Sequence, residues 1–196
     1  MDTLNGFEPA VFEIAKRVAQ IAQTTQTPIV LVEGPAGSGK TTFANLLREA
    51  LFQAERMAPR VLSMDELYPG WKGLRQGANY LIEHVLSALS MGQAATWQTW
   101  DWVLNERGGS DVGNGHRSFE PGGILIVEGC GSLSQASKPL ASLSIFIDRP
   151  EAARWAAIRG RDGERFDAHW DLWLAQEQEF YRQEGSVGLA DYLVTN

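Results

Sequence analysis

The stretch GPAGSGKTT, at positions 34–42, combines glycines, a lysine and hydroxyl side chains in an order that suits phosphate binding. Gly34, Gly39, Lys40 and Thr41 match the pattern G-x-x-x-x-G-K-[ST]. Glycines let successive backbone N–H groups point inward, and the helix that follows adds a partial positive charge. Lys40 would reach the terminal phosphates of a nucleoside triphosphate, and the Thr41 hydroxyl would bind the accompanying Mg²⁺. The stretch therefore predicts a triphosphate site, with a plain glycine-rich turn as the alternative.

Two acids stand where apolar runs end, Asp65 after RVLSM and Glu128 after GILIV. In an open α/β sheet, ligands gather at the carboxyl ends of the strands, so we expect one or both acids to face the phosphate loop. A carboxylate there can bind Mg²⁺ beside Thr41 or accept the proton of an acceptor hydroxyl. The alternatives are a capping box, in which Ser63 and Glu66 begin a helix, and a surface acid at position 128.

Apolar runs alternate with amphipathic stretches along the chain, which predicts the elements that hold these residues. Short apolar runs indicate buried strands, and apolar residues at helical spacing indicate helices. Strands are expected at 28–34, 60–65, 123–129, 143–148 and in the closing DYLVT, and helices around 11–21, after the phosphate loop, and at 79–92, 150–161 and 166–183. Strands that are apolar on both faces and separated by helices predict an α/β domain with a mostly parallel sheet of about five strands.

Composition narrows the classes of function. With 196 residues, 44% of them hydrophobic, the chain fits one globular domain over 1–196. A net charge of −7 disfavours nucleic acid as a partner. No apolar run approaches the ~20 residues of a membrane span, and the first residues do not resemble a secretion signal, so we expect a cytoplasmic protein. The single cysteine, Cys130, excludes an internal disulfide and is expected to be a small buried side chain.

The phosphate loop, together with SMDELYPGWKGL (63–74), WDW (100–102) and VEG (127–129), resembles the uridine kinase branch of the P-loop kinases. The resemblance runs from about residue 28 to 194. It implies a doubly wound P-loop NTPase fold with a mobile lid, ATP and Mg²⁺ as cofactors, and transfer of the γ-phosphate to a hydroxyl of a nucleoside-like small molecule. Trp100 replaces the family's tyrosine, and the histidine with which pyrimidine kinases recognise the base has no counterpart, so pyrimidine specificity is not implied.

The resemblance also implies roles for individual residues. Asp65 corresponds to the acid that activates the acceptor hydroxyl, and RWAAIRGRDGERF corresponds to the arginine-bearing lid, at about 158–166. The catalytic residues would be Asp65, Lys40, Arg159 and Arg161, with Arg165 as a further phosphate ligand. ATP would be bound by Gly34, Ala36, Gly37, Ser38, Gly39, Lys40, Thr41, Thr42, Arg154 and Arg159. The acceptor would be bound by Asp65, Tyr68, Trp71, Trp100, Asp101 and Arg107, and the metal by Thr41, Asp65 and Glu128. The alternatives are that the arginines solvate a helix face and that the tryptophans belong to the core.

Other functions stay open at this stage. The acceptor could instead be a sugar, a vitamin or a nucleotide, since this fold serves many substrates. The chain could also be a nucleotide-dependent switch or an ATP-binding regulatory protein that does not phosphorylate a metabolite. No lysine follows Asn or Thr, so the guanine-binding signature N-K-x-D is absent. A small-molecule acceptor is the expected partner, nucleic acid and membrane are not, and a homodimer is left open.

Overall fold

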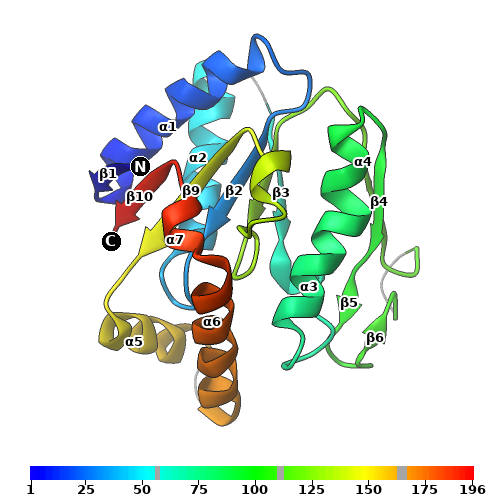
Figure 1. Ribbon diagram of the computed structural model, residues 1–196, viewed down its shortest axis with the longest axis vertical. Helices are drawn as coiled ribbons and strands as arrows, with labels where there is room; N and C mark the ends of the chain where they lie inside the picture. Colours follow the sequence, from blue (N-terminus) through cyan, green and yellow to red (C-terminus); the bar gives the residue numbers. More distant parts are fainter. Residues whose placement is uncertain (56–57, 110–112, 163–166) are drawn as a thin grey trace.

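The computed structural model describes residues 1–55, 58–109, 113–162 and 167–196. Its centre is a six-stranded sheet in the order β1-β10-β9-β2-β8-β3, in which each neighbouring pair is parallel (Figure 1). The strands are β1 Asp2–Asn5, β2 Ile29–Glu33, β3 Arg60–Ser63, β8 Leu125–Glu128, β9 Leu143–Asp148 and β10 Tyr192–Thr195. The α/β class and the parallel sheet predicted from the sequence are confirmed.

Within the central sheet, the edge strand β1 is the strand that the sequence analysis does not anticipate. The sheet therefore has six strands, where about five are expected. It pairs with β10, with Asp2 beside Tyr192 and Asn5 beside Thr195. Its sequence, DTLN, is largely exposed and has a single apolar residue, Leu4. A short polar strand is typical of a sheet edge, and it lacks the apolar run by which buried strands are recognised.

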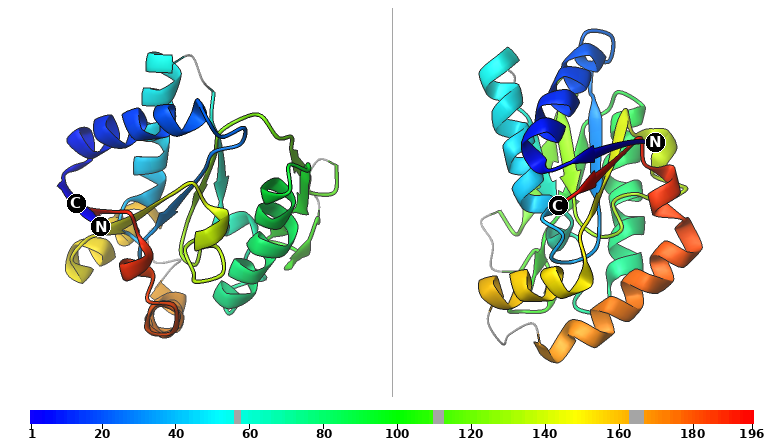
Figure 2. Two further views of the ribbon diagram at one scale, coloured as in Figure 1. Left: turned by 45° about the horizontal axis from the view of Figure 1, so that its top comes forward. Right: turned by 90° about the vertical axis from the view of Figure 1, so that its left-hand side faces the viewer.

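Helices cover both faces of the sheet. They are α1 Phe7–Ala22, α2 Lys40–Glu55, α3 Leu74–Leu81, α4 Ser87–Ser90, α5 Glu151–Asp162, α6 Trp170–Glu184 and α7 Ser186–Leu189, with short turns η1 Met64–Glu66, η2 Ile82–Leu86 (a π-helix), η3 Lys138–Leu140 and η5 Asp167–His169. Figure 2 shows α1 and α2 on one side of the sheet and α3 and α6 on the other. Within the described ranges we find no helix with the length and apolar character that a membrane span requires.

The central strand β2 shows why this layering forms. Val30 and Val32 join the core that α1 and α2 complete, whereas Ile29 and Leu31 join the core on the opposite face. Successive side chains of a strand point to opposite faces, so a strand covered on both sides is apolar throughout. The sheet is therefore doubly wound, as the resemblance implied.

Helix boundaries differ from the prediction at two places. The helix expected at 79–92 begins earlier, at Leu74, because Leu74, Ala78 and Leu81 are buried at helical spacing. The helix expected at 166–183 is α6, which begins at Trp170 after the turn η5. Of the lid expected at 158–166, residues 158–162 form the end of α5, and 163–166 lie outside the described residues.

Two small antiparallel ladders, which the sequence analysis does not anticipate, lie beside α3 and α4. In the first, β4 (Ala95–Gln98) pairs with β7 (His116–Phe119), and in the second, β5 (Trp100–Asp101) pairs with β6 (Glu106–Arg107). The second ladder carries the WDW segment toward the turn η1 that follows β3.

Candidate active site

The phosphate loop occupies residues 34–39, between the end of β2 at Glu33 and the start of α2 at Lys40. Gly37 and Gly39 have φ angles of 79° and 101°, which side-chain-bearing residues rarely adopt. A Cβ atom on Gly34 would lie 2.3 Å from the carbonyl oxygen of Ile147, and one on Gly37 would lie 2.5 Å from that of Arg154. The glycines are therefore required both by the curl of the loop and by the close approach of β9 and α5.

Lys40 projects into the site from the first residue of α2. Its Nζ atom donates a hydrogen bond to the carbonyl oxygen of Pro35 at 2.9 Å and lies 3.6 Å from Cys130 Sγ. Burial disfavours the charge, but the carboxylates of Glu177 and Glu128 hold the pKa of Lys40 above its ordinary value. The ammonium is therefore charged and fixed beside the loop, which suits a ligand with a negative charge.

Thr41 and the two predicted acids supply oxygen atoms beside Lys40. Thr41 Oγ1 donates a hydrogen bond to Glu128 Oε2 at 3.1 Å, which places the end of β8 against the start of α2. Burial raises the pKa of Glu128, while Lys40 opposes the shift. Asp65, in η1, is exposed and lines the same cavity as Thr41 and Glu128. A hydroxyl and two carboxylates are the hard oxygen donors that Mg²⁺ prefers alongside phosphate oxygens, so these residues fit a magnesium ion.

The capping alternative for Asp65 is correct in part and does not exclude a role in the site. The backbone N–H of Asp65 donates to Ser63 Oγ at 3.3 Å, so Ser63 caps the turn η1. The cap fixes the turn that follows β3, and Asp65, within this turn, lines the cavity. The hydrogen bond that caps the turn therefore also holds Asp65 in its place at the cavity.

A cavity of about 840 Å³ joins the phosphate loop to an aromatic wall. The loop side is formed by Ala36, Gly37, Gly39, Lys40, Thr41 and Thr42, with Glu128 and Cys130 in contact with it. The aromatic wall is formed by Tyr68, Trp71, Trp102 and Trp173, and Asp65 lies next to Trp102. Of the predicted loop residues, Gly34 and Ser38 complete the backbone of the loop, and Ser38 is fully buried. The structure thus brings Lys40, Thr41, Asp65 and Glu128, for which contacts with phosphate, metal or acceptor are predicted, to one cavity.

The aromatic wall is built from rings that pack on one another. Trp71 contacts Trp102 at 5.1 Å between ring centroids and stacks on His169 at 4.2 Å. The Trp173 ring meets Tyr68 edge to face at 4.9 Å. Trp71 and Trp102 therefore belong to the cavity, whereas Trp97 is buried in the core, as the alternative reading held for tryptophans in general.

The described residues that line the cavity do not include Trp100, Asp101 or Arg107. Arg107 donates to the carbonyl oxygens of Leu67 (2.8 Å) and Gln98 (3.1 Å), and its guanidinium lies 3.5 Å from the centre of the Tyr80 ring. Asp101 Oδ1 accepts from the backbone N–H groups of the two residues that follow Trp102, at 2.8 and 2.9 Å. These contacts hold the WDW segment in place, and the predicted direct contact of the three residues with an acceptor stays a prediction.

The arginines of α5 occupy different surroundings. Arg154 is buried and donates to the carbonyl oxygen of Ala36 at 3.0 Å, so it touches the phosphate loop from outside the cavity. The Arg159 guanidinium lies over the Trp155 ring at 5.2 Å. The side chain of Arg161 and all of Arg165 lie outside the described residues. Their predicted roles in phosphate binding stay predictions.

The structure adds residues that the sequence analysis overlooks. Arg149 follows the carboxyl end of β9, lines the cavity and donates to the carbonyl oxygen of Gly37 at 3.4 Å. The strand-end rule that selects Asp65 would also have selected it. Glu177 is 2% exposed and touches the loop at Ala36. The sequence marks Glu177 only as an acidic residue on the face of a helix that Trp173 and Phe180 bury.

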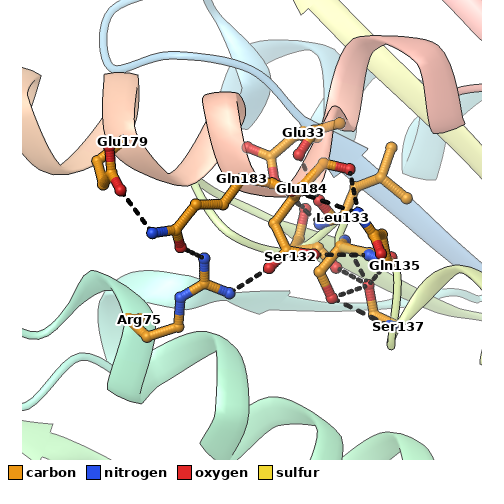
Figure 3. A network of polar contacts seen from close by, with 11 residues as sticks. Glu33, Arg75, Ser132, Leu133, Gln135, Ser137, Glu179, Gln183 and Glu184 are labelled. Atoms are coloured by element: carbon orange, nitrogen blue, oxygen red, sulfur yellow. Dashed lines mark hydrogen bonds and ion pairs between the residues drawn. The ribbon is translucent and has the colours of Figure 1, made fainter.

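Glu33, the last residue of β2, anchors the phosphate loop from below the cavity. It is fully buried and accepts hydrogen bonds from the backbone N–H groups of Gly34 (2.9 Å) and Leu133 (2.8 Å) and from the Tyr181 hydroxyl (3.0 Å). Figure 3 shows this carboxylate at one end of a polar network that extends to Arg75 and Glu184. Burial raises the pKa of Glu33 to about 7, although these hydrogen bonds lower it.

Comparisons with known proteins support the fold. No protein-family model matches the sequence, and no curated protein is significantly similar to it. The structure is similar to that of a possible uridine kinase from Bacillus stearothermophilus, with a TM-score of 0.62 and 16% identity over 93% of this chain and 99% of that one. It is also similar to a candidate fructose transport system kinase from Silicibacter sp. TM1040, with a TM-score of 0.57 and 18% identity over 94% of this chain and 98% of that one. The chain therefore shares the fold of these two structures, which is the fold that the resemblance to the P-loop kinases implied.

Proposed function

We propose that this protein is an ATP- and Mg²⁺-dependent phosphotransferase that moves the γ-phosphate to a hydroxyl group of a nucleoside-like small molecule. The observation that carries the proposal is the shared cavity, in which Lys40 and Thr41 lie on one side and Asp65 with the aromatic wall on the other. A kinase must hold two substrates side by side, and catalysis of phosphoryl transfer is largely positioning and electrostatic stabilisation.

The groups that would bind ATP and Mg²⁺, most of them beside the phosphate loop, each have a role that follows from their charge or polarity. Lys40 and the N–H groups of the first turn of α2 bind and orient the terminal phosphates. Thr41, Glu128 and Asp65 are the residues that would hold the metal, by the donor set described above. ATP supplies the phosphoryl group, and Mg²⁺ neutralises part of its charge. Arg149 adds a positive group to the same side of the cavity.

Asp65 is the proposed general base on the acceptor side. Its carboxylate would hold the proton that the acceptor hydroxyl loses as the new O–P bond forms. The position is fixed by the cap at Ser63 and by Trp102, whose Nε1–H donates to the Asp65 carbonyl oxygen at 3.0 Å.

The aromatic wall favours a planar acceptor such as a nucleoside base. The polar atoms of three wall residues are used inside the protein: Tyr68 donates its hydroxyl proton to the Cys130 carbonyl oxygen at 2.6 Å, Trp102 donates to Asp65, and Trp173 Nε1–H donates to Glu177 Oε1 at 2.9 Å. The part of the wall that a ligand could contact is therefore ring surface, above all that of Trp102, which is 39% exposed. Aromatic rings bind planar groups by stacking.

A thermal-shift screen of nucleosides, sugars and vitamins, each with a non-hydrolysable ATP analogue and Mg²⁺, tests the proposal. A ligand that binds the folded state raises the melting temperature, and we expect nucleosides to give the largest shift. A sugar or vitamin as the best ligand would change the acceptor and keep the kinase. If nucleotide binding were found but no acceptor, and if it changed the affinity for another protein, the switch function would replace the kinase.

A further inference from the structure

Ala36, in the middle of the phosphate loop, is bound by two buried charged side chains from the two helices that follow β9. Its N–H donates to Glu177 Oε1 of α6 at 2.6 Å, and its carbonyl oxygen accepts from Arg154 Nη1 of α5 at 3.0 Å. The two side chains also face each other, with 3.8 Å between Arg154 Nη1 and Glu177 Oε2. The peptide unit before Ala36 is thus fixed to α6, and the peptide unit after it is fixed to α5.

The same carboxylate touches the aromatic wall. Glu177 Oε1 accepts from the Trp173 indole N–H at 2.9 Å and from the Cys130 thiol at 3.0 Å. The Trp173 ring lines the cavity and packs against Tyr68. A single oxygen atom therefore connects the phosphate loop with the side of the cavity where the acceptor would lie.

Packing alone does not account for an acid at this position. A buried carboxylate costs free energy unless it is paired and hydrogen-bonded, and an apolar side chain could fill the space without that cost. The charge also stands next to a loop proposed to bind anions, where it opposes binding unless cations balance it. The Arg154 guanidinium faces Glu177 directly, and the negative charge of Glu177 helps to raise the pKa of Lys40.

We propose that Glu177, held by Arg154, is a positioning residue that couples the phosphate loop to the acceptor wall through Trp173. The inference rests on the proposed function. When a nucleotide fills the loop, it restrains the peptide groups of Ala36, and the bond to Glu177 transmits this restraint to α6 and to the Trp173 ring. Nucleotide bound to the loop would thereby raise the affinity of the wall for the acceptor. Because coupling between two sites is reciprocal, the acceptor would raise the affinity of the loop for nucleotide by the same factor.

Hydrogen exchange of the backbone amides of α6 tests the coupling without an acceptor. In the wild-type protein, Mg²⁺ with a non-hydrolysable ATP analogue should slow exchange in α6 by about ten-fold, the equivalent of one hydrogen bond to a charged group. Glu177→Ala, at analogue concentrations shown by calorimetry to saturate it, should show no such slowing. The matched control is Glu179→Ala, since Glu179 is an exposed acid of the same helix that pairs with Arg182.

The outcomes separate this inference from the proposed function. If the analogue binds and α6 exchange is unchanged in the wild type, or is slowed equally in Glu177→Ala, the coupling is refuted and the kinase proposal stands. If the analogue does not bind the wild type, both are refuted. Should Glu177→Ala not fold, Glu177→Met replaces it, because it keeps most of the side-chain volume and removes the oxygen atom that accepts from Ala36. Undiminished protection of α6 in that variant would also overturn the coupling.

Discussion

The two sides of the cavity are built in different ways. The phosphate side comes from one continuous strand, loop and helix, and its shape depends on glycines and backbone N–H groups. The aromatic side collects Trp71, Trp102 and Trp173 from three separate parts of the chain, and its shape depends on how their rings pack. In the proposed reaction, the first side would bind the phosphates of the nucleotide, and the second would determine which acceptor is phosphorylated.

Lys40→Ala should have the largest effect, because it removes the charge that binds the terminal phosphates. We expect product formation to be abolished and nucleotide affinity to fall, measured by a phosphotransfer assay and by calorimetry. Lys16→Ala, which removes an exposed lysine of α1, is the matched control and should leave both unchanged. Wild-type affinity and turnover in Lys40→Ala would refute the triphosphate site.

Asp65→Asn should break the acceptor side while leaving the phosphate side in place. The variant keeps the size of the side chain but loses the base, so product formation should fall by roughly 10² to 10⁴. Nucleotide affinity should change far less, because Glu128 and Thr41 remain. Phosphorylated product, rather than loss of ATP, is the quantity to measure, since hydrolysis by water also consumes ATP. A wild-type rate of product formation would show that Asp65 is not the base.

Trp71→Ala should weaken the acceptor side without affecting chemistry. Loss of a stacking ring should raise the KM for the acceptor by about ten-fold, with kcat and nucleotide affinity little changed, which steady-state kinetics can separate. Phe12→Ala is the control, because Phe12 is an exposed aromatic residue of α1 that is not among the described residues lining the cavity. An equal rise in KM in both variants would point to a general loss of stability.

Glu33→Gln should have the smallest effect on the reaction, and it tests whether the Glu33 carboxyl group, which anchors the phosphate loop, contributes to stability. The pKa of Glu33 is raised to about 7 in the folded protein from 4.5, so the folded state binds more protons in this range and stability falls as the pH rises through it. The contribution lost by pH 8 is at most about 3 kcal/mol. The unfolding free energy of the variant, measured between pH 4.5 and 8, should lose this part of its pH dependence. An unchanged pH profile would contradict the assignment.

The sequence predicts the phosphate side closely because its residues are neighbours along the chain. Lys40 and Thr41 lie where the motif places them, and the strand-end rule finds Asp65 and Glu128. The aromatic side is predicted only in part, because tertiary packing decides which tryptophans line the cavity. Trp102 lines it, and Trp100 is not among the described residues that do. Glu177 reaches Ala36 across 141 positions of sequence, a contact that no local pattern encodes.

The central claim is that both substrates bind in one cavity and that phosphate passes between them. Mass spectrometry of a mixture of the protein, Mg²⁺, ATP and the best ligand from the thermal-shift screen tests this most directly. We predict that the ligand gains one phosphate group in the presence of the wild-type protein and gains none with Lys40→Ala. Consumption of ATP with no phosphorylated ligand, at concentrations where both are shown to bind, would contradict the claim.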